Sequence, residues 1–519
     1  MRKLEKIQII KNVSSSWFAL GVNVTVGILL SPFILHRLGD SAFGIWVLIF
    51  SITGYYGLFD LGIRSSIVRY VSKSAATKDM DSLTRLINTS LFGYTCIGLL
   101  TLVVTVVLSF QVDKLFRIPV EFHDTARWLL LMVGSSVALG FPLGVFGGIL
   151  EGLQKFYVLN WTNVVSTLLR AALIVTFLRR GYGLLTVALI TIALPLVGSL
   201  VRGTVARHLL PVPLGFRYID RATFRQIANY SSTTFMIIVA GQLKFKTDEL
   251  VIGTFLSTAA ITHFNIGARI VDYAREVVTS LAQIFVPMSS QSDAVGDRNR
   301  LRKIFVAGNR ACAFTILPIC AILVILGKSV IEVWVGSRYV AQSYPVLVIM
   351  ILPFTLMLIQ GASGRILFGM SKHGTLAIVA LVEGIANLIL SILLVRPYGI
   401  VGDALGTAIP MTCTYVLFLP QHLCKRLGIP LGTFVRQAFG LPVLFCAPLV
   451  AVLLLMRRWF VAHTYRQLAV QLLAGGLVYG LCLLWAYVTG RLFRVGDLAA
   501  EEKALPLVGA PMENLQQDI

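Results

Sequence analysis

The chain has 519 residues, of which 56% are hydrophobic and only 13% charged, and its mean hydropathy is +0.82. A soluble protein of this length would have about a quarter of its residues charged, so the composition excludes a soluble enzyme or binding domain. The formal net charge of +21 is typical of a membrane protein with basic cytoplasmic loops, and no loop is long enough to form a basic module for nucleic acid.

Apolar stretches of about 20 residues recur along nearly the whole chain, and each is long enough to cross the hydrocarbon core of a membrane. They predict an all-α polytopic membrane protein with about fourteen membrane-spanning helices. In chain order we expect these helices near 14–36, 43–69, 86–110, 127–150, 157–178, 183–204, 229–254, 259–287, 304–326, 344–368, 374–395, 401–423, 435–456 and 468–490.

The chain repeats itself when it is shifted by about 217 residues. Gly147–Lys155 aligns with Gly364–Lys372, and Arg180–Leu184 aligns with Arg396–Ile400, with a residue of drift. Each repeat holds six spans, an even number, so both repeats enter the membrane from the same side. We therefore expect two six-helix lobes related by a pseudo-two-fold axis along the membrane normal, with a substrate site between them.

The repeat and the loop composition predict a division into six parts. These are a basic N-terminus at 1–12, a first lobe at 13–205, a basic cytoplasmic linker at 206–228, a second lobe at 229–425, two extra helices at 426–495 and a disordered cytoplasmic tail at 496–519. About 24 Lys and Arg residues fall in the loops of one side against about 11 on the other. This difference predicts that both termini are cytoplasmic.

Ionisable residues within the predicted spans are the main candidates for function, because a charge at membrane depth is costly unless it faces a cavity or a partner. About ten Lys and Arg lie at this depth against about six acidic residues. A cavity with surplus positive charge suits an anionic headgroup such as a phosphate or pyrophosphate, which arginine binds with paired donors. The candidate substrate-binding cations are Arg64, Arg170, Lys244, Arg269 and Arg365.

The acidic candidates for ion coupling or ion pairing are Asp60, Asp248, Asp272, Glu276 and Glu383. Asp60 and Arg64 are four residues apart on one predicted helix, as are Lys244 and Asp248 on another. Arg269, Asp272 and Glu276 share one helix face. A structural alternative is that such neighbours neutralise each other and only fix helix packing.

Motifs for catalysis are absent. The chain has no GxxxxGK[ST] loop for ATP, no HExxH or GxSxG motif, and no CxxC or Cys/His cluster among its seven cysteines. The longest predicted external loops, 111–126 and 327–343, are short for a membrane ligase or polymerase. We therefore expect a transporter with no catalytic residues, no metal and no resident cofactor.

Several stretches resemble a known family. Leu35–Trp46 and Gly57–Val71 resemble the opening of bacterial O-antigen (Wzx-type) and exopolysaccharide flippases, which belong to the multidrug/oligosaccharidyl-lipid/polysaccharide superfamily. Thr247–Gly253 and Phe264–Arg269 resemble the start of the family's second lobe. The likeness runs from about residue 12 to about residue 425, and Asp60, Arg64, Asp248 and Arg269 match charged positions of its motifs.

The resemblance implies a two-lobed flippase of the bacterial inner membrane. Its substrate would be an undecaprenyl-pyrophosphate-linked oligosaccharide, moved from the cytoplasmic to the periplasmic leaflet for surface polysaccharide export. An ion gradient of H⁺ or Na⁺, or the membrane potential, would supply the energy in place of ATP. Membrane lipids and the polymerase and chain-length proteins of the same pathway are further candidate partners, and nucleic acid is not one.

Three other readings stay open at this point. A drug antiporter of the same superfamily would need an acidic cavity for an organic cation, which the cationic surplus disfavours. A flippase for the peptidoglycan lipid precursor would share the anionic headgroup and the helix count. A ligase or polymerase acting on the same lipid-linked glycan is the alternative from another class, and it would need a catalytic external loop.

Overall fold

The computed structural model describes residues 2–77, 79–370 and 374–488, and every regular element within them is helical. The predicted tail at 496–519 lies outside these residues. The first eight α-helices are α1 (Arg2–Leu38), α2 (Asp40–Gly54), α3 (Ile63–Thr77), α4 (Met80–Ser109), α5 (Val112–Leu115), α6 (His123–Gly152), α7 (Phe156–Arg179) and α8 (Leu184–Leu209).

The remaining helices complete the chain order. They are α9 (Arg221–Phe245), α10 (Asp248–Phe255), α11 (Thr258–Ala282), α12 (Phe285–Ala294), α13 (Arg298–Val335), α14 (Val340–Leu358), α15 (Gly361–Gly369), α16 (Gly374–Cys413), α17 (Leu419–Leu427), α18 (Leu431–Trp459) and α19 (Tyr465–Val488). Short 3₁₀ segments lie at Tyr55–Asp60, Val120–Phe122, Phe216–Tyr218 and Ser337–Tyr339, and a π-helical turn occupies Thr414–Phe418.

Eleven helical stretches in the described part of the chain are long and apolar enough to cross a membrane. The number is lower than the predicted fourteen for two reasons. Gly374–Leu427 is one continuous stretch, although Gly399 breaks it with a φ of 60° at the junction of two predicted spans. The predicted spans 229–254 and 259–287 are not among the eleven.

Four helices predicted as continuous are broken. The span at 43–69 divides into α2, a 3₁₀ segment and α3, and Leu61 at the junction is left-handed with a φ of 50°. The span at 229–254 divides at Lys246 into α9 and α10, and α9 begins at Arg221, earlier than expected. The spans at 259–287 and 344–368 divide into α11 and α12 and into α14 and α15. Mid-helix 3₁₀ segments of this kind often mark hinges.

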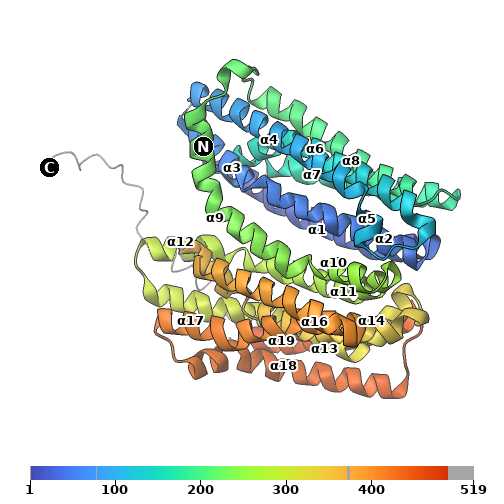
Figure 1. Ribbon diagram of the computed structural model, residues 1–519. Coiled ribbons are helices and arrows are strands. Elements are labelled where there is room, and N and C mark those ends of the chain that lie inside the picture. The colour runs from blue at the N-terminus through green and yellow to red at the C-terminus, as the bar shows by residue number, and fades with distance from the viewer. Residues whose placement is uncertain (1, 78, 371–373, 489–519) are drawn as a thin grey trace.

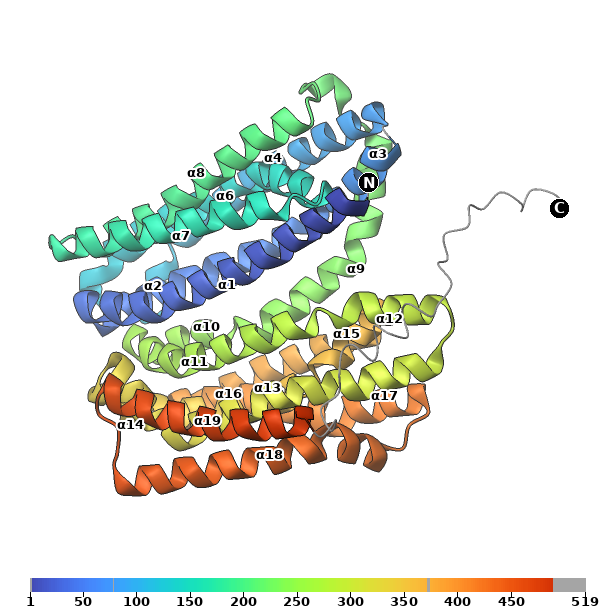
Figure 2. The same ribbon diagram turned by 180° about the vertical axis from the view of Figure 1, so that it is seen from behind.

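The helices form two groups (Figure 1). The first bundle consists of α1–α8 and the second bundle of α9–α19. In both views (Figures 1 and 2) α1 and α2 lie on the side of the first bundle that faces α10 and α11, while α18 lies on the side of the second bundle away from the first. The polypeptide thus places α1, α2, α10 and α11 at the boundary between the bundles.

Helix boundaries recur along the chain at the spacing found in the sequence. α1 ends at Leu38 and α10 at Phe255, and α4 begins at Met80 and α13 at Arg298. α6 and α14 likewise begin at His123 and Val340. These helix boundaries therefore recur about 217 residues apart, although the counterparts of the continuous helices α1 and α6 are broken in the second bundle, into α9 and α10 and into α14 and α15.

The two bundles touch most closely where α2 crosses α11. A Cβ atom on Gly44 of α2 would lie 1.8 Å from the carbonyl oxygen of Thr258, so only glycine permits this approach of the two backbones. Near the same crossing, the hydroxyl of Thr262 donates to the carbonyl of Asp40 at 2.7 Å. This contact holds the two bundles together at one end of their boundary.

Candidate functional site

A cavity of about 400 Å³ lies between the two bundles. Its walls come from α1, α2, α7 and α8 on one side and from α10, α11 and the junction before α10 on the other. Breaking the span 229–254 at Lys246 is what brings that residue and Glu249 to the cavity wall. The site therefore requires both halves of the chain.

Five ionisable residues line this central cavity. Arg170, Lys246 and Arg269 are basic, and Glu249 and Glu276 are acidic, which leaves one surplus positive charge. Within the described residues, the Arg170 guanidinium has no hydrogen-bond or ion-pair partner. A partner-free guanidinium facing a cavity suits an anionic ligand, because arginine can donate two parallel hydrogen bonds to one phosphate.

Aromatic and amide side chains complete the cavity wall. Trp46 and Phe50 lie one turn apart on α2, with their ring centroids 4.5 Å apart and their planes tilted by 41°. Asn23 and Asn265 face the cavity from the two bundles, and Asn23 accepts a hydrogen bond from Thr167 at 2.9 Å. Flat rings beside amide groups are the combination that binds sugar rings, with stacking on one face and hydrogen bonds to the hydroxyls.

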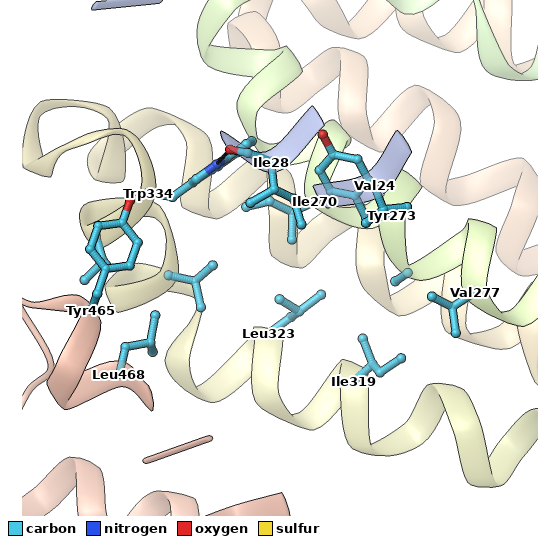
Figure 3. Close-up of a pocket in the computed structure, with 13 residues that line it drawn as sticks. Val24, Ile28, Ile270, Tyr273, Val277, Ile319, Leu323, Trp334, Tyr465 and Leu468 are labelled. Atoms are coloured by element: carbon cyan, nitrogen blue, oxygen red, sulfur yellow. Dashed lines mark hydrogen bonds between the residues drawn. The ribbon is translucent and has the colours of Figure 1, made fainter. Parts of the chain in front are cut away.

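An apolar groove of about 370 Å³ adjoins the central cavity (Figure 3). α1, α11, α13 and α19 form it, and Tyr273 lines both the groove and the cavity. In Figure 3, Ile319 and Leu323 lie on one side of the groove and Ile270 and Tyr273 on the other. Trp334 closes one end by donating from its indole N–H to the carbonyl of Ile28 at 2.7 Å.

The groove is open at the molecular surface. Ile28 and Val277 are 38% and 37% exposed, and Tyr465 of α19 is 67% exposed. In a bilayer, such an opening at the height of the spanning helices would be filled by hydrocarbon chains. The protein thus offers a polar compartment and an apolar compartment that meet at Tyr273.

A polar cluster joins the bundles at the end of the boundary near Gly44. Arg338 donates to the carboxylate of Asp40 at 3.1 Å, and the hydroxyl of Tyr339 donates to the same carboxylate oxygen. His263 packs against the Tyr339 ring, with centroids 5.3 Å apart. We call Asp40, Arg338 and Tyr339 the latch, because they connect α2 of the first bundle to the turn before α14 of the second.

The predicted candidates are distributed over several places. Of the five candidate cations, Arg170 and Arg269 line the central cavity. The suggested pairing of Asp60 with Arg64 is wrong. Arg64 instead pairs with Glu151 at the end of α6, with 2.6 Å between Nη2 and Oε1, and Asp60 accepts a hydrogen bond from the hydroxyl of Tyr94. The break at Leu61 turns the two side chains out of the register of a continuous helix.

The suggested pairing of Lys244 with Asp248 is also wrong. The Lys244 ammonium lies 2.6 Å from the carboxylate of Glu383 on α16, and both side chains are buried. It also donates to the Tyr415 hydroxyl at 3.3 Å, and this tyrosine lies in the π-helical turn. Lys244, Glu383 and Arg365 all line a second cavity of about 380 Å³ within the second bundle.

Asp248 lies in a separate buried cluster. Its carboxylate accepts from the Thr407 hydroxyl at 3.0 Å, and that hydroxyl also lies 3.1 Å from Asn387 Oδ1. Asp403 is fully buried, and neither of its carboxylate oxygens has a hydrogen-bond partner among the described residues. Its charge lies within electrostatic range of Asp248 and Glu249, so three buried acids gather here.

Asp272 and Glu276 stay on the predicted face of α11, but only Glu276 lines the central cavity. Asp272 accepts from Arg275 at 2.7 Å, and the Arg269 guanidinium lies over the ring of Tyr273, 5.3 Å from its centroid. The expected Arg269, Asp272 and Glu276 set is therefore split between the cavity and a local pair.

Sequence reasoning missed Glu151, Tyr273 and Asp403, and it placed Lys246 and Glu249 on the other side of the helix from Lys244 and Asp248 without selecting them as site residues. Asp403 lies inside the predicted span 401–423, and the rule that selected Asp248 applies equally to it. Lys246 and Glu249 lie in the predicted span 229–254 beside Lys244 and Asp248. Nothing in the sequence indicates that the chain breaks there and turns them toward the other bundle.

Known proteins with similar sequences and structures agree with this architecture. The chain is 19% identical over 425 residues, 81% of its length, to a putative O-antigen transporter of Shigella flexneri, of which the match covers 99%. Its fold is similar to that of the lipid II flippase MurJ in an inward closed conformation, with a TM-score of 0.73 and 18% identity over 93% of this chain and all of that one.

A second similar structure is an inward-facing multidrug resistance MATE family transporter of the MOP superfamily. The TM-score is 0.68 at 14% identity, over 81% of this chain and 98% of that one. The prediction of a polytopic membrane transporter rather than an enzyme agrees with these matches. The family model described as polysaccharide biosynthesis protein matches residues 9–293, more than half of the chain, and the chain belongs to that family.

Proposed function

We propose that the protein is a flippase that moves a polyprenyl-pyrophosphate-linked oligosaccharide from the cytoplasmic to the periplasmic leaflet of the bacterial inner membrane, for surface polysaccharide export. One observation carries the proposal: a cationic cavity with aromatic and amide walls adjoins an apolar groove that opens at the surface. A lipid-linked glycan has the same two parts, a charged polar head and a hydrocarbon tail.

The two compartments divide the substrate between them. The pyrophosphate binds Arg170 and Arg269, whose guanidinium groups supply paired donors. The first sugars stack against Trp46 and bind the amides of Asn23 and Asn265. The tail stays in the groove and in the surrounding lipid, so that hydrocarbon never enters the polar cavity. Tyr273 separates the two compartments with an aromatic ring and a hydroxyl.

Transport then requires the cavity to open to each side in turn. In this proposal, twelve of the fourteen predicted spans form two six-helix lobes, the last two spans lie outside them, both termini are cytoplasmic, and the lobes rock about their common axis. The latch must open when the cavity faces the periplasm. The helix interruption that follows α2 faces the one between α9 and α10 across the boundary. The hydroxyls of Tyr55 and Thr247 are hydrogen-bonded at 2.9 Å, and the Gln242 side chain donates to the Gly54 carbonyl at 3.0 Å. We propose the two interruptions as the hinges.

The buried acids provide a site for coupling to an ion gradient. Asp248, Glu249 and Asp403 lie together without a basic partner for Asp403, and burying several like charges is costly. In our proposal this cluster takes up a proton or a monovalent cation in one conformation and releases it in the other. Because Glu249 lines the central cavity, the cluster and the substrate site are in electrostatic contact.

A flippase for the peptidoglycan lipid precursor is the second candidate, favoured by the similarity of the fold to MurJ. It would use the same cavity and groove, because the headgroup chemistry is the same. Essentiality separates the two: loss of a peptidoglycan flippase kills the cell, whereas loss of a surface-polysaccharide flippase often does not. The surplus positive charge of the cavity disfavours an antiporter for organic cations.

The decisive experiment is to delete the gene and determine on which leaflet the lipid-linked oligosaccharides accumulate. Completed repeat units on the cytoplasmic face, together with loss of surface polymer, are expected. Repeat units that reach the periplasmic face but stay unpolymerised would instead indicate an enzyme of a later step. Arg269→Glu, expressed in the deletion strain, should reproduce the accumulation without loss of the protein from the membrane.

A further inference from the structure

A second basic site lies far from the central cavity, where α13 meets α17 and α18. A pocket of about 330 Å³ is lined there by Arg302, Lys303 and Arg310 of α13, together with Val306, Ile429 and Gln437. Arg302, Val306 and Arg310 are spaced four residues apart and therefore share one face of the helix. No acidic residue lines the pocket.

The two arginines are held in place by the neighbouring backbone. Arg302 donates from Nε to the carbonyl of Leu427 at 2.6 Å, at the end of α17. Arg310 donates from Nε to the carbonyl of Gln437 at 2.7 Å, on α18. Within the described residues, the terminal nitrogens of Arg310 have no hydrogen-bond partner. A guanidinium fixed through Nε with its terminal donors free is organised in advance to bind an anion.

The pocket lies at the level where two spanning helices enter the apolar layer. In α13, Arg310 is followed by residues 311–327 without a single charge, and in α18, Gln437 is followed by residues 438–456 without one. The bond between Arg310 and Gln437 aligns these two starting points. The pocket thus lies at the height of lipid headgroups, with Val306 and Ile429 beside the hydrocarbon region.

The segments of the chain that form this pocket contain basic residues and no acidic ones. Residues 298–331 contain no Asp or Glu, and neither do residues 404–496, which include α17, α18 and α19. The basic residues Lys425, Arg426 and Arg436 flank the pocket in the sequence. A wall built from two segments without any acid in their sequence attracts a negatively charged ligand.

We propose that this pocket binds the headgroup of an anionic phospholipid from the cytoplasmic leaflet. The lipid phosphate is held between the Arg302 and Arg310 guanidinium groups, and the acyl chains run along Val306 and Ile429 toward the bilayer. Basic pockets between spanning helices on the cytoplasmic side are suited to such headgroups. The site does not depend on the proposed flippase activity, because α18 lies on the side of the second bundle away from the first (Figures 1 and 2).

The proposal is tested with the full-length protein purified in neutral detergent. Native mass spectrometry measures binding of phosphatidylglycerol and of phosphatidylcholine with the same acyl chains. Thermal unfolding measures the effect of phosphatidylglycerol and of inorganic phosphate. We expect wild-type protein to bind phosphatidylglycerol more tightly than phosphatidylcholine, and millimolar phosphate to leave the unfolding temperature unchanged, since it lacks the acyl chains.

Substitutions locate the binding. Each of Arg302→Gln and Arg310→Gln should weaken phosphatidylglycerol binding about fivefold, whereas Arg302→Lys and Arg310→Lys should retain most of it. The matched control is Arg457→Gln, because Arg457 also donates to a carbonyl across the same helix pair, that of Ile325 at 3.0 Å, at the opposite end. It should bind phosphatidylglycerol like the wild type.

Three results would overturn the proposal. One is unchanged phosphatidylglycerol binding in a folded Arg310→Gln protein, and another is equal binding of phosphatidylcholine by the wild type. The third is the same stabilisation by inorganic phosphate as by phosphatidylglycerol, which would assign the pocket to a free anion. If the Arg302→Gln variant does not fold, the two lysine variants and the Arg310→Gln variant still decide the question.

Discussion

One inter-helix ion pair of the first bundle lies near the surface, whereas one of the second bundle is buried. Arg64 and Glu151 are 48% and 22% exposed, and Lys244 and Glu383 are 6% and 3% exposed, although both pairs span 2.6 Å. The two pairs have the same N···O distance, but breaking them should change the free energy of unfolding by different amounts. Water screens the first pair, so that breaking it costs little. In the second pair, removing one partner leaves a charge without a counter-ion inside the protein.

The difference teaches how each bundle contributes to the proposed mechanism. In the second bundle, Lys244 and Glu383 form a buried ion pair, so that loss of either charge leaves the other without a partner. In the first bundle, the cavity-facing cation Arg170 has no partner among the described residues and is available to a ligand. The Lys244–Glu383 pair is thus structural, whereas Arg170 at the boundary is available for binding.

The largest expected effect is on stability. Glu383→Gln or Lys244→Met leaves one buried charge unpaired and should destabilise the protein by about 3–5 kcal/mol. Thermal unfolding of the purified protein in detergent measures this loss. The double variant Lys244→Met with Glu383→Met removes both charges and should recover most of the stability. A double variant less stable than either single variant would contradict the comparison.

The next effect is on transport. Arg269→Glu and Arg170→Glu reverse a charge in the central cavity and should reduce export of surface polymer by about tenfold or more, since each removes a charged hydrogen bond to the headgroup. Polymer at the surface and protein in the membrane fraction are both measured. Arg269→Lys, which retains the charge, should keep most activity. Wild-type export in both charge-reversed variants would contradict the proposal that the cationic cavity binds the headgroup.

The sequence was sufficient to predict the all-helical polytopic membrane class and two of the charged residues that line the central cavity, Arg170 and Arg269, because apolar length and the cost of buried charge are properties of single segments. Pairings between charges were not predictable. Arg64 and Lys244 each form an ion pair with a residue on a helix distant in the sequence. Helix breaks and the crossings between helices determine which side chains meet, and neither can be read from the sequence. Asp403 should have been recognised, since the same rule covers it, but Lys246 reaches the cavity only because α9 ends there.

A smaller effect is expected at the exposed pair of the first bundle. Arg64→Gln and Glu151→Gln should each change stability by less than about 1 kcal/mol, and their coupling in a double-mutant cycle should be below that value, because the arginine is half exposed. Export by Arg64→Gln should fall much less than export by Arg269→Glu. A loss as large as that of Arg269→Glu would mean that substrate contacts Arg64 on its path, as the sequence motif suggests.

The smallest expected effect lies between the bundles, at the start of α9. Asp220 is the N-cap of this helix and accepts bonds from the backbone N–H of Thr223 at 2.8 Å and from its hydroxyl at 2.7 Å. These bonds hold the pKa of Asp220 below its ordinary value. The cap therefore stabilises the helix start above the carboxyl's unfolded pKa of about 3.9, and the stabilisation is lost as the pH falls through the lower folded pKa.

Hydrogen exchange at the Thr223 amide measures the strength of this cap. Asp220→Ala should speed exchange by a few-fold, at most about tenfold, at neutral pH. Asp220→Asn keeps an acceptor and should stay close to the wild type, while removing the dependence on acid. Because Asp220 also donates its backbone N–H to Thr89 of α4 at 3.1 Å, the cap joins the linker to the first bundle. Exchange that does not change in Asp220→Ala would show that this attachment, and not the carboxylate, fixes where the second bundle begins.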